Sequence, residues 1–164
     1  YFLGIQELLL HFHPFVGAIF IPALALGALA FLPFYDLQTQ SVGVYFRTWR
    51  GRYLSLIAAG LGVLLTPAWI LLDEFFLDWT GWLPTWPTLI TNGVFPLSFI
   101  LLGLIALDEG VKKSLKASRE ERILFLFIFL FTALVVLTIV GIFFRGPGMA
   151  LVWPWAATDA GLIH

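Results

Sequence analysis

The chain has 164 residues, of which 60% are hydrophobic and only 12% are charged, and its mean hydropathy is +0.97. A soluble domain carries about 25% charged residues, so this composition indicates an integral membrane protein. The formal net charge of −1 gives no indication of nucleic-acid binding. The absence of cysteine excludes disulfides, cysteine-ligated iron–sulfur clusters and covalently attached haem within the chain.

The first thirteen residues predict a short amphipathic helix. Glu7 and His11 are spaced i, i+4 on one face, together with Gly4, so the two polar side chains can meet. Pro14 has no N–H to donate and suits the first turn of a following helix. We therefore expect the chain to turn there from the membrane surface into the bilayer. The opposite face is apolar and carries Tyr1, Ile5, Leu8 and Phe12.

Four apolar stretches are long enough to cross a hydrocarbon core of about 30 Å, which takes about 20 helical residues. We expect an all-α membrane domain over residues 14–144, preceded by the surface helix at 1–13 and followed by an outer-surface tail at 145–164. Because the chain begins without Met and without a signal-peptide pattern, we expect it to be a fragment or a processed chain. The four predicted spans are residues 14–35, 53–72, 89–107 and 123–144. Three of them contain a proline inside the span or near its end, where a kink is expected: Pro22, Pro67 and Pro96.

The basic residues predict the orientation in the membrane. Three of the nine lie in residues 36–52 and five in residues 108–122, so that only Arg145 lies elsewhere. Because translocation disfavours basic loops, we expect both loops in the cytoplasm. Both termini and the loop at residues 73–88 are then expected on the periplasmic side of a bacterial inner membrane.

Tryptophan is concentrated on this predicted outer side. An indole has an apolar body and one N–H, so it settles at the level of the lipid headgroups. An ordinary aromatic belt accounts for each tryptophan alone, but the length of the outer loop also favours a surface element that is packed against something. The residues concerned are Trp69, Trp79, Trp82, Trp86, Trp153 and Trp155.

The four predicted spans contain no Asp, Glu, Lys, Arg or His. Intramembrane ionisable groups mark ion pathways and proton relays, so their absence counts against an autonomous pump, channel or ion-coupled transporter. His11, His13 and His164 all lie outside the spans. The sequence therefore predicts no metal ligand and no bis-histidine haem in this chain.

The opening Tyr-Phe-Leu, followed by a short helix, a proline and a membrane helix, resembles the C-terminal half of cytochrome b. In the split, chloroplast-type arrangement this half is called subunit IV. A first span that ends in Leu-Pro, a loop with Phe-Arg and a span that ends in Thr-Pro-Ala-Trp extend the similarity over about residues 1–107. The last predicted span and the tail are similar to extensions in bacterial menaquinol–cytochrome c reductases.

This resemblance implies a half-site for quinol oxidation on the outer face. The quinol would be menaquinol or ubiquinol, bound at an interface with partner chains. One electron would pass to a Rieske iron–sulfur protein and the other to a b-type haem in a cytochrome b partner, with a c-type cytochrome beyond. A dimeric multi-subunit complex in the lipid bilayer is also implied.

The resemblance also implies where the quinol binds. Tyr1 corresponds to the last residue of the family's Pro-Glu-Trp-Tyr motif, whose glutamate has no counterpart among these residues. Glu7 and His11 are weak candidates for carrying the proton outward, and the alternative is that they are ordinary surface polar groups. The predicted quinol-binding residues are Tyr1, Phe2, Leu3, Ile5 and Gln6, the last where many members have a second tyrosine.

A second function stays open from the sequence. The chain would then be a non-catalytic scaffold or assembly subunit of another quinone-linked respiratory complex, whose outer loop binds a periplasmic partner. Both functions explain spans without charges and an outer face rich in tryptophan.

Overall fold

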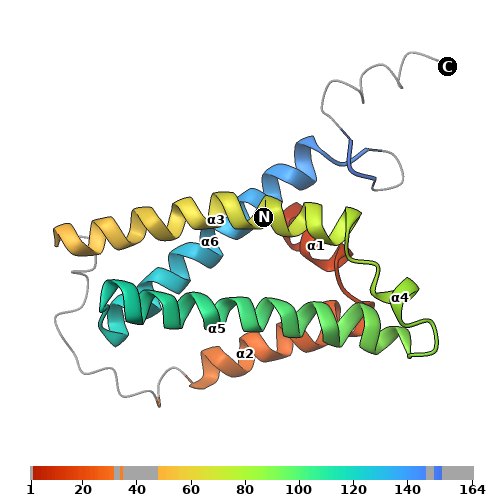
Figure 1. Cartoon of the computed structure of the whole chain (residues 1–164), viewed down its shortest axis with the longest axis horizontal. Coiled ribbons are helices and arrows are strands. Elements are labelled where there is room, and N and C mark those ends of the chain that lie inside the picture. Colours follow the sequence, from red (N-terminus) through yellow and green to blue (C-terminus); the bar gives the residue numbers. More distant parts are fainter. Residues whose placement is uncertain (1, 32–33, 35–47, 147–149, 153–164) are drawn as a thin grey trace.

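The computed structural model describes residues 2–31, 34, 48–146 and 150–152, with side chains from Leu3 onward, and this part of the chain contains helices and no strand (Figure 1). The all-helical fold predicted from the composition is confirmed. In chain order the elements are α1 (Phe2–Leu10), η1 (Val16–Phe20), α2 (Ile21–Phe31), α3 (Trp49–Phe75), α4 (Trp79–Trp82), η3 (Ile90–Val94), α5 (Phe95–Leu115) and α6 (Arg119–Phe143).

Three helices are long and apolar enough to cross a membrane. They are α3 with 27 residues, the continuous η3–α5 helix with 26 and α6 with 25, and they cover the last three predicted spans. The first predicted span, residues 14–35, corresponds to a helix that is described over residues 14–31 and contains η1 and α2. Those eighteen residues rise about 27 Å, close to a hydrocarbon core of about 30 Å. Residues 32, 33 and 35 of this predicted span lie outside the described residues.

Local sequence sets the helix ends on the basic side of the bundle. Thr48 caps α3 by accepting a hydrogen bond from the Gly51 N–H at 3.1 Å. Ser118 and Glu121 form a reciprocal capping box at the start of α6. The helix before α6, α5, ends at Leu115. The next residue, Lys116, has a left-handed backbone (φ 46°), which lets the chain turn directly into α6.

The main packing joins α6 to two other helices. Along α3 and α6 a buried core forms, and Gly62 lets α6 approach so closely that a Cβ there would lie 2.9 Å from Thr132. On the other flank α1 packs against the C-terminal half of α6, where a Cβ at Gly4 would lie 2.3 Å from the Thr138 hydroxyl. The buried core of the bundle consists of Leu54, Ala58, Val111, Phe125 and Phe129.

The helical bundle has two ends that differ in charge and in the elements they hold (Figure 1). At one end α3 begins, α5 ends and α6 begins, and this end carries seven basic residues. The opposite end holds α1, the start of η1, the end of α3, α4, η3 and Arg145. The seven are Arg50, Arg52, Lys112, Lys113, Lys116, Arg119 and Arg122.

Both π-helical segments lie just before a proline. Pro22 follows η1 and Pro96 follows η3. A proline cannot donate to the carbonyl four residues earlier, and a wider π turn accommodates this loss. Two of the three prolines expected to distort helices therefore do so at the end of the bundle that holds α1 and Arg145.

The tryptophan-rich loop packs against η3–α5 rather than standing free. Asp78 caps α4 by accepting from the Gly81 N–H at 2.8 Å. Trp79 then stacks on Phe95 with ring centroids 5.8 Å apart, and Trp86 reaches the same ring at 6.0 Å. The loop is thus a packed surface element, as its length indicated.

Candidate functional site

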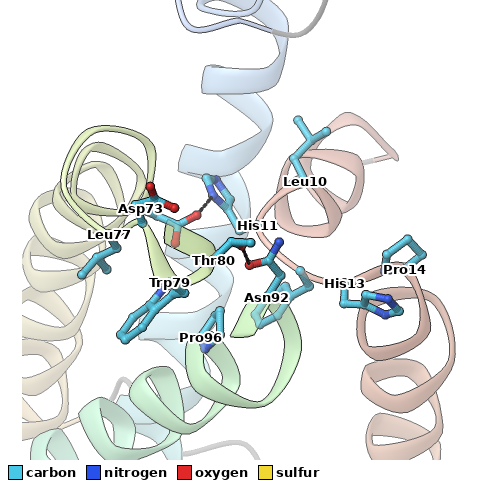
Figure 2. A pocket seen from close by; sticks show the side chains of 12 residues that line it. Leu10, His11, His13, Pro14, Asp73, Leu77, Trp79, Thr80, Asn92 and Pro96 are labelled. Atoms are coloured by element: carbon cyan, nitrogen blue, oxygen red, sulfur yellow. Dashed lines mark hydrogen bonds and ion pairs between the residues drawn. The ribbon is translucent and has the colours of Figure 1, made fainter. Parts of the chain in front are cut away.

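A cleft of about 320 Å³ opens at the end of the bundle that holds α1 (Figure 2). Its walls come from the turn between α1 and η1, from the end of α3 with α4, and from η3–α5. The lining mixes apolar and polar side chains. The residues are Leu10, His11, Phe12, His13, Pro14, Asp73, Leu77, Asp78, Trp79, Thr80, Asn92 and Pro96.

A histidine–carboxylate pair forms one wall of the cleft. The His11 Nδ1 lies 2.6 Å from Asp73 Oδ2, and its Nε2 lies 3.7 Å from Glu7 Oε1. Burial by itself lowers the pKa of His11, but the hydrogen bond to Asp73 and the nearby Glu7 carboxylate outweigh it and raise the pKa to about 9. The imidazole is therefore protonated at neutral pH and donates to Asp73.

A buried ion cluster lies directly behind this wall. Arg145 holds the Glu7 carboxylate through two nitrogens, Nη2 to Oε1 at 2.6 Å and Nε to Oε2 at 2.9 Å. Its third nitrogen, Nη1, donates to Glu74 at 3.1 Å. Burial raises the pKa of Glu7, yet the positive charge of His11 at 3.7 Å and the hydrogen bonds from Arg145 hold it below its ordinary value, so the carboxylate stays ionised.

The sequence builds this cluster from three distant segments. The i, i+4 spacing on α1 brings Glu7 and His11 together, as predicted. The small Gly4 on the same face lets α1 approach α6 closely enough to bury that polar face. After α6, Arg145 pairs with Leu151 in an isolated antiparallel bridge.

Glu7 and His11 are not surface polar groups. Glu7 is only 1% exposed and His11 only 7%, so the polar face of α1 packs on the bundle. The alternative in which they are ordinary surface residues is therefore wrong. Arg145 and Asp73 are the ionic partners that offset the free-energy cost of burying the two charged side chains.

The opposite wall of the cleft is organised around Asn92. Pro96 has no N–H for the Asn92 carbonyl four residues earlier, and that oxygen accepts from the His13 N–H at 2.6 Å. The Asn92 side-chain oxygen accepts from the Thr80 hydroxyl at 2.8 Å. His13 Nδ1 in turn accepts from the Phe15 N–H at 3.3 Å at the start of the following helix.

Of the five residues predicted to bind quinol, Leu3, Ile5 and Gln6 do not line this cleft. On α1, Leu3 is 41% exposed and Ile5 is 42% exposed, and Gln6 is half-buried. Tyr1 lies outside the described residues, as does the Phe2 side chain. The quinol assignment of these five residues therefore stays a prediction.

Sequence reasoning missed Asp73, Thr80 and Asn92, which the structure brings into the cleft with His11. Each lies just outside or near the end of an apolar stretch, where a polar residue is unremarkable by sequence alone. The spacing of Asn92 four residues before Pro96 was the one available signal, because it leaves a carbonyl without its helical donor.

Across the described residues, no three His, Cys, Asp or Glu side chains gather in a group that could hold a metal ion. His164 lies outside that part of the chain, so the expectation that this chain provides no metal ligand stays a prediction.

The fold and the site define a helical protein with three helices of membrane-spanning length and a polar cleft beside a buried ion cluster at one end of the bundle. Comparison of the chain with protein-family models, with curated proteins and with solved structures finds no match.

Proposed function

We propose that this chain is a membrane subunit of a quinol-oxidising electron-transfer complex and that its cleft forms part of a quinol site on the outer side. The observation that carries the proposal is the buried His11–Asp73 pair, 2.6 Å apart, in the wall of a cleft at the end of the bundle opposite seven basic residues. The resemblance of the sequence to the C-terminal half of cytochrome b supports it.

The size and lining of the cleft suit the head group of a quinol. About 320 Å³ is near the lower end of the range for small-molecule sites, roughly 300–1,000 Å³, which fits one ring system rather than an extended ligand. Leu10, Leu77 and Pro96 provide apolar contact for the ring. Asp73, held by His11, and Asn92 offer polar groups on opposite walls for its hydroxyl groups (Figure 2).

The protonation state of His11 determines what it does in the reaction. A quinol loses two electrons and two protons on oxidation, and the proposal passes the electrons to a haem b-bearing partner and a Rieske iron–sulfur protein. His11 already carries its proton at neutral pH and donates it from Nδ1 to Asp73 at 2.6 Å, so it orients that carboxylate in the wall of the cleft. Asp73, which lines the cleft together with Asp78, takes the two protons one after the other and passes each to outer water.

The charge distribution supports an outer position for the cleft. Seven basic residues lie at the far end of the described bundle, and basic segments stay in the cytoplasm. The cleft end then faces the periplasm of a bacterial inner membrane. With Val16–Phe31 as a fourth, shorter span, both termini lie on that side.

The test is purification of the native complex. We expect an optical spectrum of b-type haem that quinol reduces, and we expect His11→Asn to slow quinol oxidation at least tenfold with the complex intact. Ser98→Ala is the matched control, because Ser98 lies on α5 outside the cleft. A complex without haem, or one whose turnover His11→Asn leaves unchanged, rejects the proposal.

The alternative function is a non-catalytic scaffold subunit. It is favoured by the ion cluster, which ties α1, the end of α3 and the segment after α6 together, and by the exposure of Trp82 and Trp86. In that case His11→Asn would reduce the amount of assembled complex but not the turnover of each assembled copy.

A further inference from the structure

We propose that the carboxamide of Asn92 is the hydrogen-bond donor that holds a ring carbonyl or hydroxyl oxygen in the cleft, and that Thr80 is the residue that positions it. This inference rests on the proposed function and names the group that selects the ligand. It assigns a role to the wall of the cleft opposite His11.

Three contacts fix the position of Asn92. Its backbone oxygen accepts from the His13 N–H at 2.6 Å, because Pro96 leaves that oxygen without a helical donor. Its neighbours Thr91 and Gly93 are both buried, so the backbone is packed on either side. A Cβ at Gly93 would lie 2.8 Å from Val16, which shows how closely η3 meets η1.

The Thr80 hydroxyl then fixes the orientation of the side chain. It donates to the Asn92 Oδ1 at 2.8 Å, which occupies the acceptor end of the amide. The donor end, the NH₂ group, is directed into the cleft toward the side where His11 lies (Figure 2). The Asn92 amide therefore presents its N–H groups to a cleft whose other polar lining residues are His11, His13, Asp73, Asp78, Trp79 and Thr80.

This arrangement favours a ligand that accepts hydrogen bonds. A quinone carbonyl accepts from an amide N–H, and a quinol hydroxyl oxygen does so through its lone pairs. A hydrocarbon ring of the same shape makes the apolar contacts only. The structure thus predicts a difference in affinity between ligands with and without ring oxygens, and that difference depends on Asn92.

The experiment measures binding to the full chain in lipid nanodiscs. The probe is menadione (2-methyl-1,4-naphthoquinone), and the control ligand is 2-methylnaphthalene, which has the ring without its oxygens. Dissociation constants come from saturation-transfer NMR with the signal of empty nanodiscs subtracted. Thermal melting of each variant verifies that the fold is retained.

We expect Asn92→Leu to raise the dissociation constant for menadione about threefold to tenfold, the effect of losing one hydrogen bond. Asn92→Asp keeps the oxygen that accepts from Thr80 but loses the N–H donor, so it should weaken menadione binding as well. This variant provides the test if Asn92→Leu does not fold. Neither change should alter the affinity for 2-methylnaphthalene, and Ser98→Ala should alter neither affinity.

The positioning role of Thr80 has its own readout. Thr80→Val leaves the amide free to rotate and should weaken menadione binding by about threefold, whereas Thr80→Ser restores the hydroxyl and should return it to within about twofold of the original. If Thr80→Val binds menadione with unchanged affinity, Thr80 does not position Asn92.

The outcomes separate the inference from the function on which it rests. If menadione binds and His11→Asn weakens it while both Asn92 variants bind normally, Asn92 is not the donor, and the quinol site remains. If the unaltered chain does not bind menadione saturably, the quinol site and this inference both fail.

Discussion

The guanidinium of Arg145 holds the carboxylate of Glu7 through two nitrogens, at 2.6 and 2.9 Å, across a separation of 138 residues. The two side chains are only 5% and 1% exposed. A buried ion pair is worth little over an apolar pair of the same shape, but removing one partner leaves an uncompensated charge. The pair therefore locks α1 to the segment that follows α6.

We predict that Arg145→Met destabilises the fold strongly. The change leaves the buried Glu7 carboxylate without its hydrogen-bonded cation and with only His11 at 3.7 Å, and breaking such a pair typically costs about 3–5 kcal/mol. The matched control is Lys112→Ala, which removes a pair with Glu109 whose side chains are 53% and 41% exposed. That loss should be about 1 kcal/mol or less. Thermal unfolding in nanodiscs measures both, and equal shifts of the melting temperature would contradict the locking role.

We predict that stability falls as the pH rises from 6.5 through about 9. Folding raises the pKa of His11 from 6.5 to about 9, so the folded state binds this proton more tightly. Its contribution is complete below pH 6.5 and is lost as the pH passes the folded value. The charged groups that face it are Glu7 on α1 and Asp73 on α3, with Arg145 beyond Glu7.

The measurement is the melting temperature as a function of pH for the original chain and for His11→Asn. The asparagine does not titrate, so its profile between pH 6.5 and 9 should be flatter. The same slope in both proteins would show that another group is responsible.

We predict that Gly4→Ala displaces α1 from α6. A Cβ at that position would lie 2.3 Å from the Thr138 hydroxyl and 3.0 Å from the Leu134 carbonyl oxygen, which belongs to the backbone and cannot rotate away. Overpacking of this kind costs about 1–3 kcal/mol. Gly27→Ala on α2 is the matched control, because nothing lies within 4 Å of its added Cβ. It should leave the melting temperature unchanged or raise it slightly, since alanine favours a helix over glycine.

We predict that the cleft end of the bundle faces outward. The chain has no cysteine, so single cysteines at Thr85 and Ser118 can be labelled selectively in intact cells with a membrane-impermeant maleimide. Position 85 should react and position 118 should not, because the basic end stays in the cytoplasm. The reverse pattern would invert the topology and remove the outer-side quinol site.

The sequence alone determined the class of protein and most of its helices. Apolar stretches of about 20 residues must pair their backbone groups internally in lipid, so composition and length predict helices near residues 53–72, 89–107 and 123–144. The turn before Pro14 and the Glu7–His11 contact followed from local rules as well, because proline geometry and i, i+4 spacing act within one turn. The helix at residues 14–31 agrees with the predicted start of the first span, and the predicted end of that span stays a prediction because residues 32, 33 and 35 lie outside the described residues.

Only the tertiary structure decided which side chains act together. Amphipathic spacing placed Glu7 and His11 on one face of α1, but whether that face met water or protein depended on Gly4 and on Arg145, far along the chain. Likewise the cleft joins His11 to Asp73 and Thr80 to Asn92, pairs 62 and 12 residues apart. Ion pairing and burial are properties of groups that meet in space, so the protonation of His11 and the orientation of Asn92 arise only when the helices pack.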